Sequence, residues 1–221
     1  MKHFSLDYLQ FFKELAPNNN KDWFDLHRKR YENSVREPFK KFVTTLIDEI
    51  SKEDPEIQIT QKEAIFRINR DIRFSKDKTP YKLNNSAIIS KKGRRDKSYP
   101  GLYVELGPEK LGVYGGIFRP DTSQTLRIRN YISNNVREFQ AIITHKKFIE
   151  TFVEMRGDKG KRIPKQLKEV GDREPLIYNK QWYYFTHIDP EVIESETLLD
   201  TILRINMTAK PMREFLKKAI Q

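Results

Sequence analysis

The residues whose types and spacing suggest chemistry lie in one short segment, residues 65–82, which reads IFRINRDIRFSKDKTPYK. Arginine is the side chain best shaped to hold a phosphate or carboxylate through two parallel hydrogen bonds. Three arginines, several lysines and a tyrosine hydroxyl follow one another here, and we predict that they surround one oxyanion. The predicted ligand-binding residues are Arg67, Arg70, Asp71, Arg73, Lys76, Asp77, Lys78, Tyr81 and Lys82.

The members of this block have different expected roles. Arg67 and Arg73 would clamp the oxyanion, Lys78 would add positive charge, and Tyr81 would donate a hydrogen bond. The two aspartates would orient the arginines. An alternative hypothesis is an internal ion-pair network, in which the aspartates neutralise two cations and fasten the loop to the sheet without any ligand.

The alternation of the block predicts a half-buried strand over residues 64–74. Its core-facing positions would be Ala64, Phe66, Ile68, Ile72 and Phe74. Arg70 falls on the apolar side, where a guanidinium needs a carboxylate or several carbonyl groups. Either the strand has a bulge there or an acid such as Asp71 holds Arg70, and breaking a buried pair of this kind would cost about 3–5 kcal/mol.

The same block resembles the signature of a mainly bacterial family, domain-of-unknown-function family 2461. That signature is R-x-x-R-D-x-R-F followed closely by D-K-x-x-Y. The matching residues are Arg67, Arg70, Asp71, Arg73, Phe74, Asp77, Lys78 and Tyr81. The helix start at 20–31, the glycine-bearing segment 111–118 and the helix at Pro211 are similar too, so the resemblance covers nearly the whole chain. It implies that the residues of the block act together, and it implies no particular activity.

Periodicity and turn residues predict the surrounding elements. Apolar residues recur at helical spacing through the first fifty residues, and Asn20 and Pro38 are typical of helix starts. Alternation predicts strands at 85–90, 102–106, 111–118 and 182–188, and helical patterns return at 120–154, 190–205 and 210–220. The predicted fold is α+β, one domain over residues 1–221, with an antiparallel sheet of about five strands flanked by N- and C-terminal helices. Residues 1–52 would be helical, 61–118 would form the sheet, and 120–221 would be mostly helical with one further strand.

The positive charge is local. The chain has 42 Lys and Arg against 31 Asp and Glu, a net charge of +11. Residues 61–100 hold 12 basic against 4 acidic residues, and residues 156–168 hold 6 against 1. Clustered positive charge indicates an anionic partner, whereas solvated lysine-rich loops are the alternative for residues 156–168.

Several classes of site are excluded by the sequence. Cysteine is absent, which rules out disulfides, zinc–thiolate sites and cysteine nucleophiles. No P-loop or dinucleotide-binding glycine motif is present, and the four histidines have no metal-ligand spacing, so we expect neither a metal nor a cofactor. His27 and His187 are expected to be packing or surface residues; in an enzyme, His187 with Asp71 or Asp77 would be the first acid–base candidates.

Three hypotheses for function follow. The leading one is an intracellular, cytoplasmic domain that binds a phosphate-bearing small molecule, which leaves open whether it is an enzyme acting on a phosphoester. The second is a non-catalytic nucleic-acid-binding module whose surface joins the block, residues 91–97 and residues 156–168. The third is a structural or interaction domain in which the block only stabilises the fold. No apolar run is long enough for a membrane helix and no signal peptide is predicted, so we expect no membrane partner.

Overall fold

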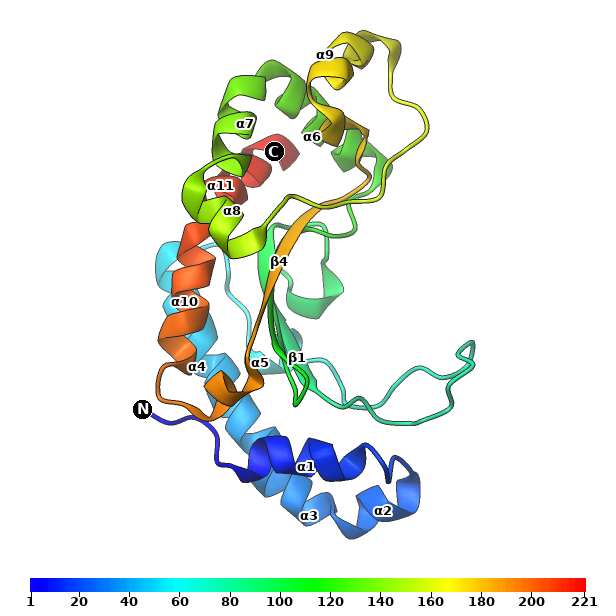
Figure 1. Cartoon of the computed structure of the whole chain (residues 1–221), viewed down its shortest axis with the longest axis vertical. Helices are drawn as coiled ribbons and strands as arrows, with labels where there is room; N and C mark the ends of the chain where they lie inside the picture. Colours follow the sequence, from blue (N-terminus) through cyan, green and yellow to red (C-terminus); the bar gives the residue numbers. More distant parts are fainter. The chain divides into compact units, whose positions relative to one another are not determined.

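The computed structural model describes all of residues 1–221 (Figure 1). The N-terminal helices are α1 (Asp7–Leu15), α2 (Lys21–Leu26), α3 (Arg28–Arg30), the π-helix η1 (Tyr31–Arg36), α4 (Glu37–Glu53) and α5 (Gln61–Ala64). The strands are β1 (Asn85–Ile89), β2 (Gly101–Leu106), β3 (Leu111–Ile117) and β4 (Trp182–Ile188). The later helices are α6 (Thr122–Asn134), α7 (Val136–Ile143), α8 (Lys146–Phe152), α9 (Lys168–Arg173), α10 (Leu198–Thr208) and α11 (Lys210–Ile220). Short 3-10 turns are η2 (Gly93–Arg95), η3 (Lys165–Leu167), η4 (Pro175–Tyr178) and η5 (Pro190–Glu194).

The α+β class is confirmed, and so is a single antiparallel sheet. The sheet has four strands in the order β1-β2-β3-β4, so neighbours in sequence are neighbours in space. Residues 107–110 make a short turn between β2 and β3, as antiparallel neighbours allow, whereas residues 118–181, which include α6 to α9, connect β3 to β4. The number of strands is one fewer than the predicted five.

The missing strand is the one predicted over residues 64–74. A capping box between Thr60 and Glu63 starts the short helix α5 there, because each side chain bonds the other residue's backbone N–H. The chain after it makes only isolated antiparallel bridges, such as Ile65 with Ala87. Alternating burial holds as far as Ile68, which is 8% exposed, but Phe74 is 95% exposed. The prediction that Phe74 lies in the core is therefore wrong: alternation reports which face a strand buries, and no sheet lies beside the chain at this point.

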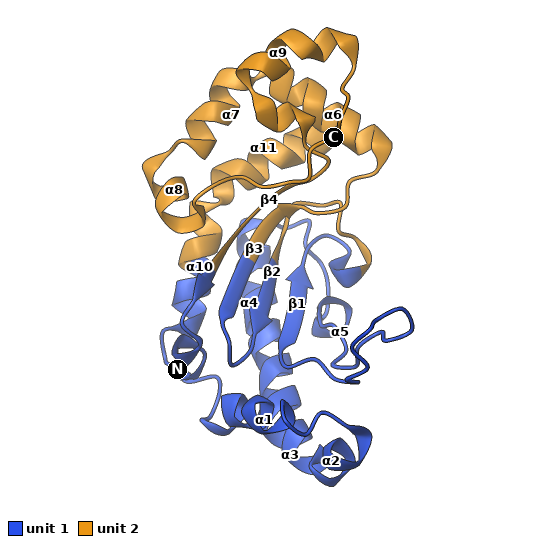
Figure 2. Cartoon of the chain, turned by 45° about the vertical axis from the view of Figure 1, so that its right-hand side comes forward, with its two compact units in different colours: residues 1–94, 103–113, 187–203 blue, residues 95–102, 114–186, 204–221 orange.

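The chain divides into two compact units, each assembled from three segments (Figure 2). Unit 1 contains residues 1–94, 103–113 and 187–203, and unit 2 contains residues 95–102, 114–186 and 204–221. The single-domain organisation over residues 1–221 stays a prediction. No helix in either unit has the length and apolar character that crossing a bilayer requires.

Unit 1 has an aromatic core. α1 buries one face and packs against η1, which also packs against α4. Phe11 of α1 is fully buried, and its ring centroid lies 5.5 Å from that of Tyr31 in η1 and 6.1 Å from that of Phe24 in α2. Each such aromatic side chain contributes about 1.5–3 kcal/mol through burial, so these contacts fix η1 and α2 against α1.

Unit 2 is organised around α11, which packs against α6 and α7. The ring of Phe215 lies 4.9 Å from Tyr131 and 5.3 Å from Phe139 between centroids. Gly116, in β3, has φ +96° and lies so close to β4 that a β-carbon would collide with the backbone carbonyl of Trp182. This combination of positive φ and close strand approach requires glycine.

We therefore expect the Gly116→Ala substitution to lower the free energy of unfolding by at least about 2 kcal/mol, because it adds both backbone strain and a clash. That loss corresponds to a fall in Tm of roughly 4–8 °C, measurable by circular dichroism on heating. Gly160→Ala is the matched control, since its β-carbon would meet its nearest neighbours at 3.4 Å without a positive φ. An equal effect of the two substitutions would contradict the assigned role of Gly116.

Candidate functional site

Most of the predicted block forms a protruding arm, residues 69–81, in unit 1. Its root is closed by the antiparallel bridge between Asn69 and Tyr81. The backbone N–H of Arg70 donates to the carbonyl of Pro80 at 2.8 Å, and that of Lys82 donates to Ile68 at 2.9 Å. The arm is thus a narrow hairpin joined to the unit at its root only.

Arg70 is held by an acid, which is one of the two alternatives that the sequence left open, and this acid is Asp77 and not Asp71. Arg70 Nη1 lies 2.5 Å from Asp77 Oδ2 and also donates to the hydroxyl and carbonyl of Thr79. The backbone N–H of Thr79 bonds the other carboxylate oxygen at 2.9 Å. The Thr79 backbone, then Arg70, lower the pKa of the Asp77 carboxyl to about 2.

Asp71 pairs with Arg73 instead. Arg73 Nε donates to Asp71 Oδ1 at 2.9 Å and Nη2 donates to Oδ2 at 2.7 Å, a bidentate geometry that lowers the pKa of Asp71 to about 2. The side chain of Arg73 is 76% exposed and that of Asp71 is 48% exposed. An exposed pair contributes about 0–1 kcal/mol, so the larger cost expected for a buried pair does not apply here.

The remaining members of the block lie in different surroundings. The Tyr81 ring is buried and stacks on Phe24 with 4.0 Å between centroids, and the ammonium of Lys82 lies 5.5 Å from the centroid of Phe66. Lys78 Nζ donates to the carbonyl of Ile72. Lys76 and Arg67 are exposed. The nine predicted residues therefore do not surround one point: the arm pairs four of them internally, and Arg67 and Tyr81 line a cavity at its root.

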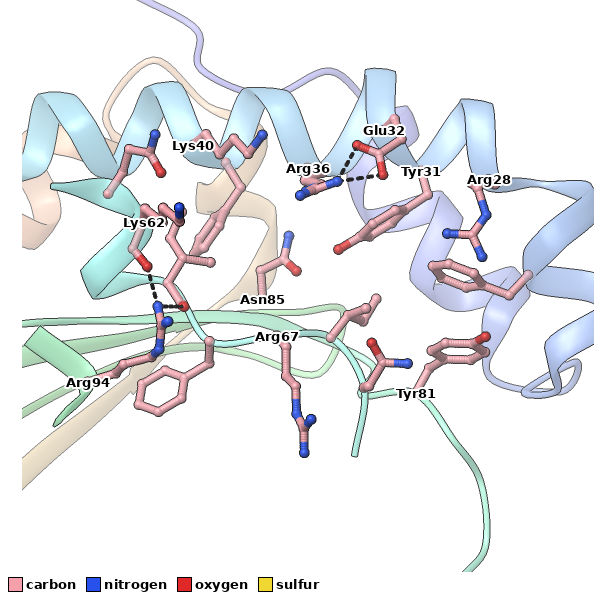
Figure 3. A pocket seen from close by; sticks show the side chains of 17 residues that line it. Arg28, Tyr31, Glu32, Arg36, Lys40, Lys62, Arg67, Tyr81, Asn85 and Arg94 are labelled. Carbon is pink, nitrogen blue, oxygen red and sulfur yellow. Dashed lines mark hydrogen bonds and ion pairs between the residues drawn. The ribbon is translucent and has the colours of Figure 1, made fainter. Parts of the chain in front are cut away.

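This cavity has a volume of about 600 Å³ and lies within unit 1 (Figure 3). One wall comes from α2, η1 and α4, and the other comes from α5, residues 65–69 and β1. Its lining carries six cations, which are Arg28, Arg36, Lys40, Lys62, Arg67 and Arg94. Glu32 is the one carboxylate among the lining residues. Three of these cations pair with carboxylates: Arg28 with Asp25, Arg36 with Glu32 and Lys40 with Glu37. The other three leave the cavity electropositive.

The cations of the cavity differ in how fully they are paired. Arg36 Nη1 donates hydrogen bonds to both carboxylate oxygens of Glu32, at 2.8 and 2.9 Å. Its Nε and Nη2 groups therefore keep their hydrogen-bonding capacity. Arg94 donates to the backbone carbonyls of Lys62 and Ile65. The side chains of Arg67 and Lys62 make no ion pair. Several donors around the cavity thus remain available.

Two neutral donors complete the lining. The hydroxyl of Tyr31 and the amide of Asn85 point toward each other from the helical wall and the strand wall (Figure 3). Burial raises the pKa of Tyr31 to about 12, so its hydroxyl stays protonated at neutral pH. Asn85 is 5% exposed, and its Nδ2 has no hydrogen-bond partner. Burial raises the pKa of the nearby Tyr8 hydroxyl, and the side chain of Asn85 opposes that rise. A buried donor without a partner is uncommon in folded proteins, which makes this amide a candidate for contact with a ligand.

The helical wall has an unusual backbone. Tyr31, Glu32 and Arg36 all belong to η1, a π-helix of six residues. π-helical turns are rare and occur frequently at functional sites, because they re-aim side chains that an α-helix would distribute differently. The next charged side chain of the cavity, Lys40, follows in α4 and pairs with Glu37 at 2.6 Å.

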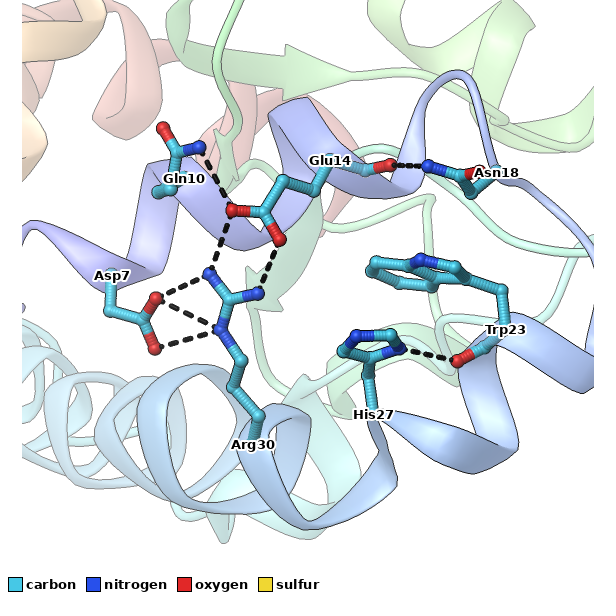
Figure 4. Close-up of polar contacts among 7 residues, drawn as sticks. All are labelled: Asp7, Gln10, Glu14, Asn18, Trp23, His27 and Arg30. Carbon is cyan, nitrogen blue, oxygen red and sulfur yellow. Dashed lines mark hydrogen bonds and ion pairs between the residues drawn. The ribbon is translucent and has the colours of Figure 1, made fainter.

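His27 does not line the cavity, and its ring packs on a neighbouring side chain (Figure 4). The His27 ring stacks on Trp23 with 4.0 Å between centroids, and its Nδ1 bonds the Trp23 carbonyl at 2.8 Å. Next to it, Arg30 bonds both Asp7 and Glu14 and joins α3 to α1. No three His, Asp or Glu side chains lie close enough together to hold a metal ion.

Sequence reasoning missed several residues of this cavity, notably Arg28, Arg36, Lys40 and Asn85. The first three lie on helices, where a charged residue indicates only a solvated face. Asn85 lies at a strand start, and its orphaned amide has no signature in sequence. The excess of positive charge over residues 61–100 does include Lys62, Arg67 and Arg94.

The arm's ion pairs predict a specific pH dependence. Both aspartates have folded-state pKa values of about 2, below the ordinary 3.8. Their contribution to stability is therefore complete above about pH 3.8 and lost as the pH falls through about 2. Titration of carboxyl ¹³C shifts by NMR should give midpoints near 2 for Asp71 and Asp77. Arg73→Gln should raise the midpoint of Asp71 only; a wild-type Asp71 midpoint near 3.8 would show that the pair does not persist in solution.

Comparison with known proteins gives one match. No curated protein and no solved structure matches the chain. A family model described as "Conserved hypothetical protein (DUF2461)" matches residues 7–215, which include both walls of the cavity and the whole arm. This confirms the resemblance noted from the sequence. The chain belongs to the DUF2461 family.

Proposed function

We propose that the cavity of unit 1 binds a phosphate-bearing small molecule. The observation that carries the proposal is the buried, unpartnered Nδ2 of Asn85 in a cavity whose lining has six cations and one carboxylate. A phosphate group accepts several charge-assisted hydrogen bonds at once, and it would satisfy this donor while offsetting the positive charge.

The donors of the cavity have complementary geometries for such a group. The free Nε and Nη2 edges of Arg36 supply the parallel donors that a phosphate accepts. Tyr31 and Asn85 add neutral donors from opposite walls. Glu32 would keep its two bonds to Nη1, so ligand binding need not break the ion pair.

The volume favours a ligand larger than a free phosphate ion. About 600 Å³ lies within the roughly 300–1,000 Å³ range of small-molecule sites. The lining adds the rings of Phe66 and Tyr81 to the charged groups, which suits a phosphorylated organic molecule. A cytoplasmic location and an anionic small-molecule partner belong to this proposal, which is restricted to binding.

Substitution of Arg36 tests the charge requirement. We expect Arg36→Gln to weaken binding of pyrophosphate, measured by isothermal titration calorimetry at low salt, by about tenfold or more, because a charged hydrogen bond contributes about 1.5–3 kcal/mol. Arg173→Gln is the matched control: Arg173 also pairs with a glutamate four residues earlier, at 2.5 Å, but it lies in unit 2. Equal affinities of the two variants would contradict the proposed site.

Substitution of Asn85 separates binding from stability. Asn85→Leu keeps the approximate shape and removes the unsatisfied donor, so the free energy of unfolding should stay the same or rise by up to about 1 kcal/mol. Pyrophosphate affinity should fall by about fivefold or more, because the ligand loses one neutral hydrogen bond in a desolvated site. A variant that binds like the wild type would show that this amide does not face the ligand; thermal unfolding of the unliganded variant verifies its fold.

A further inference from the structure

The arm carries the most exposed large hydrophobic side chain of the protein, Phe74. Figures 1 and 2 both show residues 69–81 extending as a thin loop beyond the sheet and helices of unit 1. Phe74 lies near the far end of this loop and is 95% exposed. Only one charged group covers its ring: the guanidinium of Arg73 lies 5.9 Å from the ring centroid. An aromatic side chain presented in this way has no role in the core.

Beyond its root, where Tyr81 packs on Phe24, the arm is held together by bonds between its own residues. The Arg73–Asp71 pair lies next to the tip, and the Arg70–Asp77 pair links the two limbs. The ammonium of Lys78 reaches across to the carbonyl of Ile72 at 3.0 Å. These bonds hold the limbs together before any partner binds, which reduces the entropy lost on binding.

The charge around the tip is positive. Residues 69–81 contain four basic and two acidic side chains. Because the two carboxylates are engaged by the two arginines, Lys76 and Lys78 supply the uncompensated charge. An anionic partner with flat apolar faces would satisfy both features of the tip: the exposed ring and the adjacent cations.

We propose that the arm is a nucleic-acid-binding element in which Phe74 stacks on a base and Lys76 and Lys78 contact the flanking phosphates. Aromatic side chains beside cationic groups hold single strands in this way, and apolar wedges enter duplex steps in minor-groove binders. Bases offer flat faces and phosphates offer charge at regular spacing, so one partner satisfies both parts of the tip.

A lipid surface fits the tip less well. Phe74 is the one fully exposed large apolar side chain of the arm, whereas Ile72 is half-buried. A single inserted ring gives weak anchoring, because stable membrane attachment needs more apolar area or a second anchor. Stacking on a base, in contrast, uses one ring per site. The proposal rests on the arm alone and does not use the cavity of unit 1.

Fluorescence anisotropy of the full chain with fluorescein-labelled oligothymidine, and with a duplex of the same length, tests the arm. We expect binding that weakens steeply as salt rises. Phe74→Ala should weaken binding of the preferred form about tenfold, and Phe74→Trp should retain it and show quenched indole fluorescence on binding. Leu26→Ala is the matched control, since Leu26 is also a large hydrophobic side chain of unit 1 and is 81% exposed. The Lys76→Gln/Lys78→Gln double substitution should reduce the salt slope by about two.

Three results would overturn the proposal: no binding of either oligonucleotide at low salt, equal affinities of Phe74→Ala and wild type, or a loss in Leu26→Ala as large as in Phe74→Ala. Binding to vesicles of anionic phospholipid is measured in a separate experiment. Vesicle binding that requires Phe74, without oligonucleotide binding, would assign the arm to a membrane surface instead. Arg36→Gln should leave oligonucleotide binding unchanged. Failure of the proposal for the arm can therefore be distinguished from failure of the proposal for the cavity.

Discussion

The contact between Tyr81 and the N-terminal helices holds both the arm and the cavity of unit 1 in place. Its ring stacks on Phe24 of α2, and its backbone N–H and carbonyl both bond the side chain of Asn19, at 3.1 and 2.9 Å. These bonds join segments that lie 62 residues apart. They close the root of the arm on one side and one wall of the cavity on the other. The stack fixes the Tyr81 ring at the root of the arm, where the residue also lines the cavity.

The two groups of cations in unit 1 differ in how they are compensated. Within the arm, each arginine meets a carboxylate two or seven residues away, so its field is largely cancelled at short range. Around the cavity, three of the six cations pair with a carboxylate, whereas Lys62, Arg67 and Arg94 make no ion pair. Like charges brought together in this way lower stability unless a counter-charge arrives. The basic block of the sequence thus divides into two parts: a hairpin held together by its own ion pairs, and part of an electropositive cavity.

Local patterns predicted much of the architecture and little of the site. The strand predicted at 85–90 is β1 at Asn85–Ile89, and the helix predicted at 210–220 is α11 at Lys210–Ile220, because periodicity and turn residues act over a few positions. The strand predicted over residues 64–74 was wrong, because alternation does not show whether a neighbouring strand exists. For Arg70 the sequence left a bulge or an acid open, and the chain folds back at the tip so that Asp77, and not Asp71, pairs with it.

By itself, the sequence determined the α+β class, the antiparallel connections, the family and the segment in which positive charge gathers, since each of these depends on composition or on residues close together along the chain. Only the tertiary structure decided that Phe74 is exposed, that Asn85 is buried without a partner, and that Arg36 and Lys40 stand opposite Lys62 and Arg94. The reason is geometric: a cavity forms between elements tens of residues apart, and whether a polar group is satisfied depends on what those elements place against it.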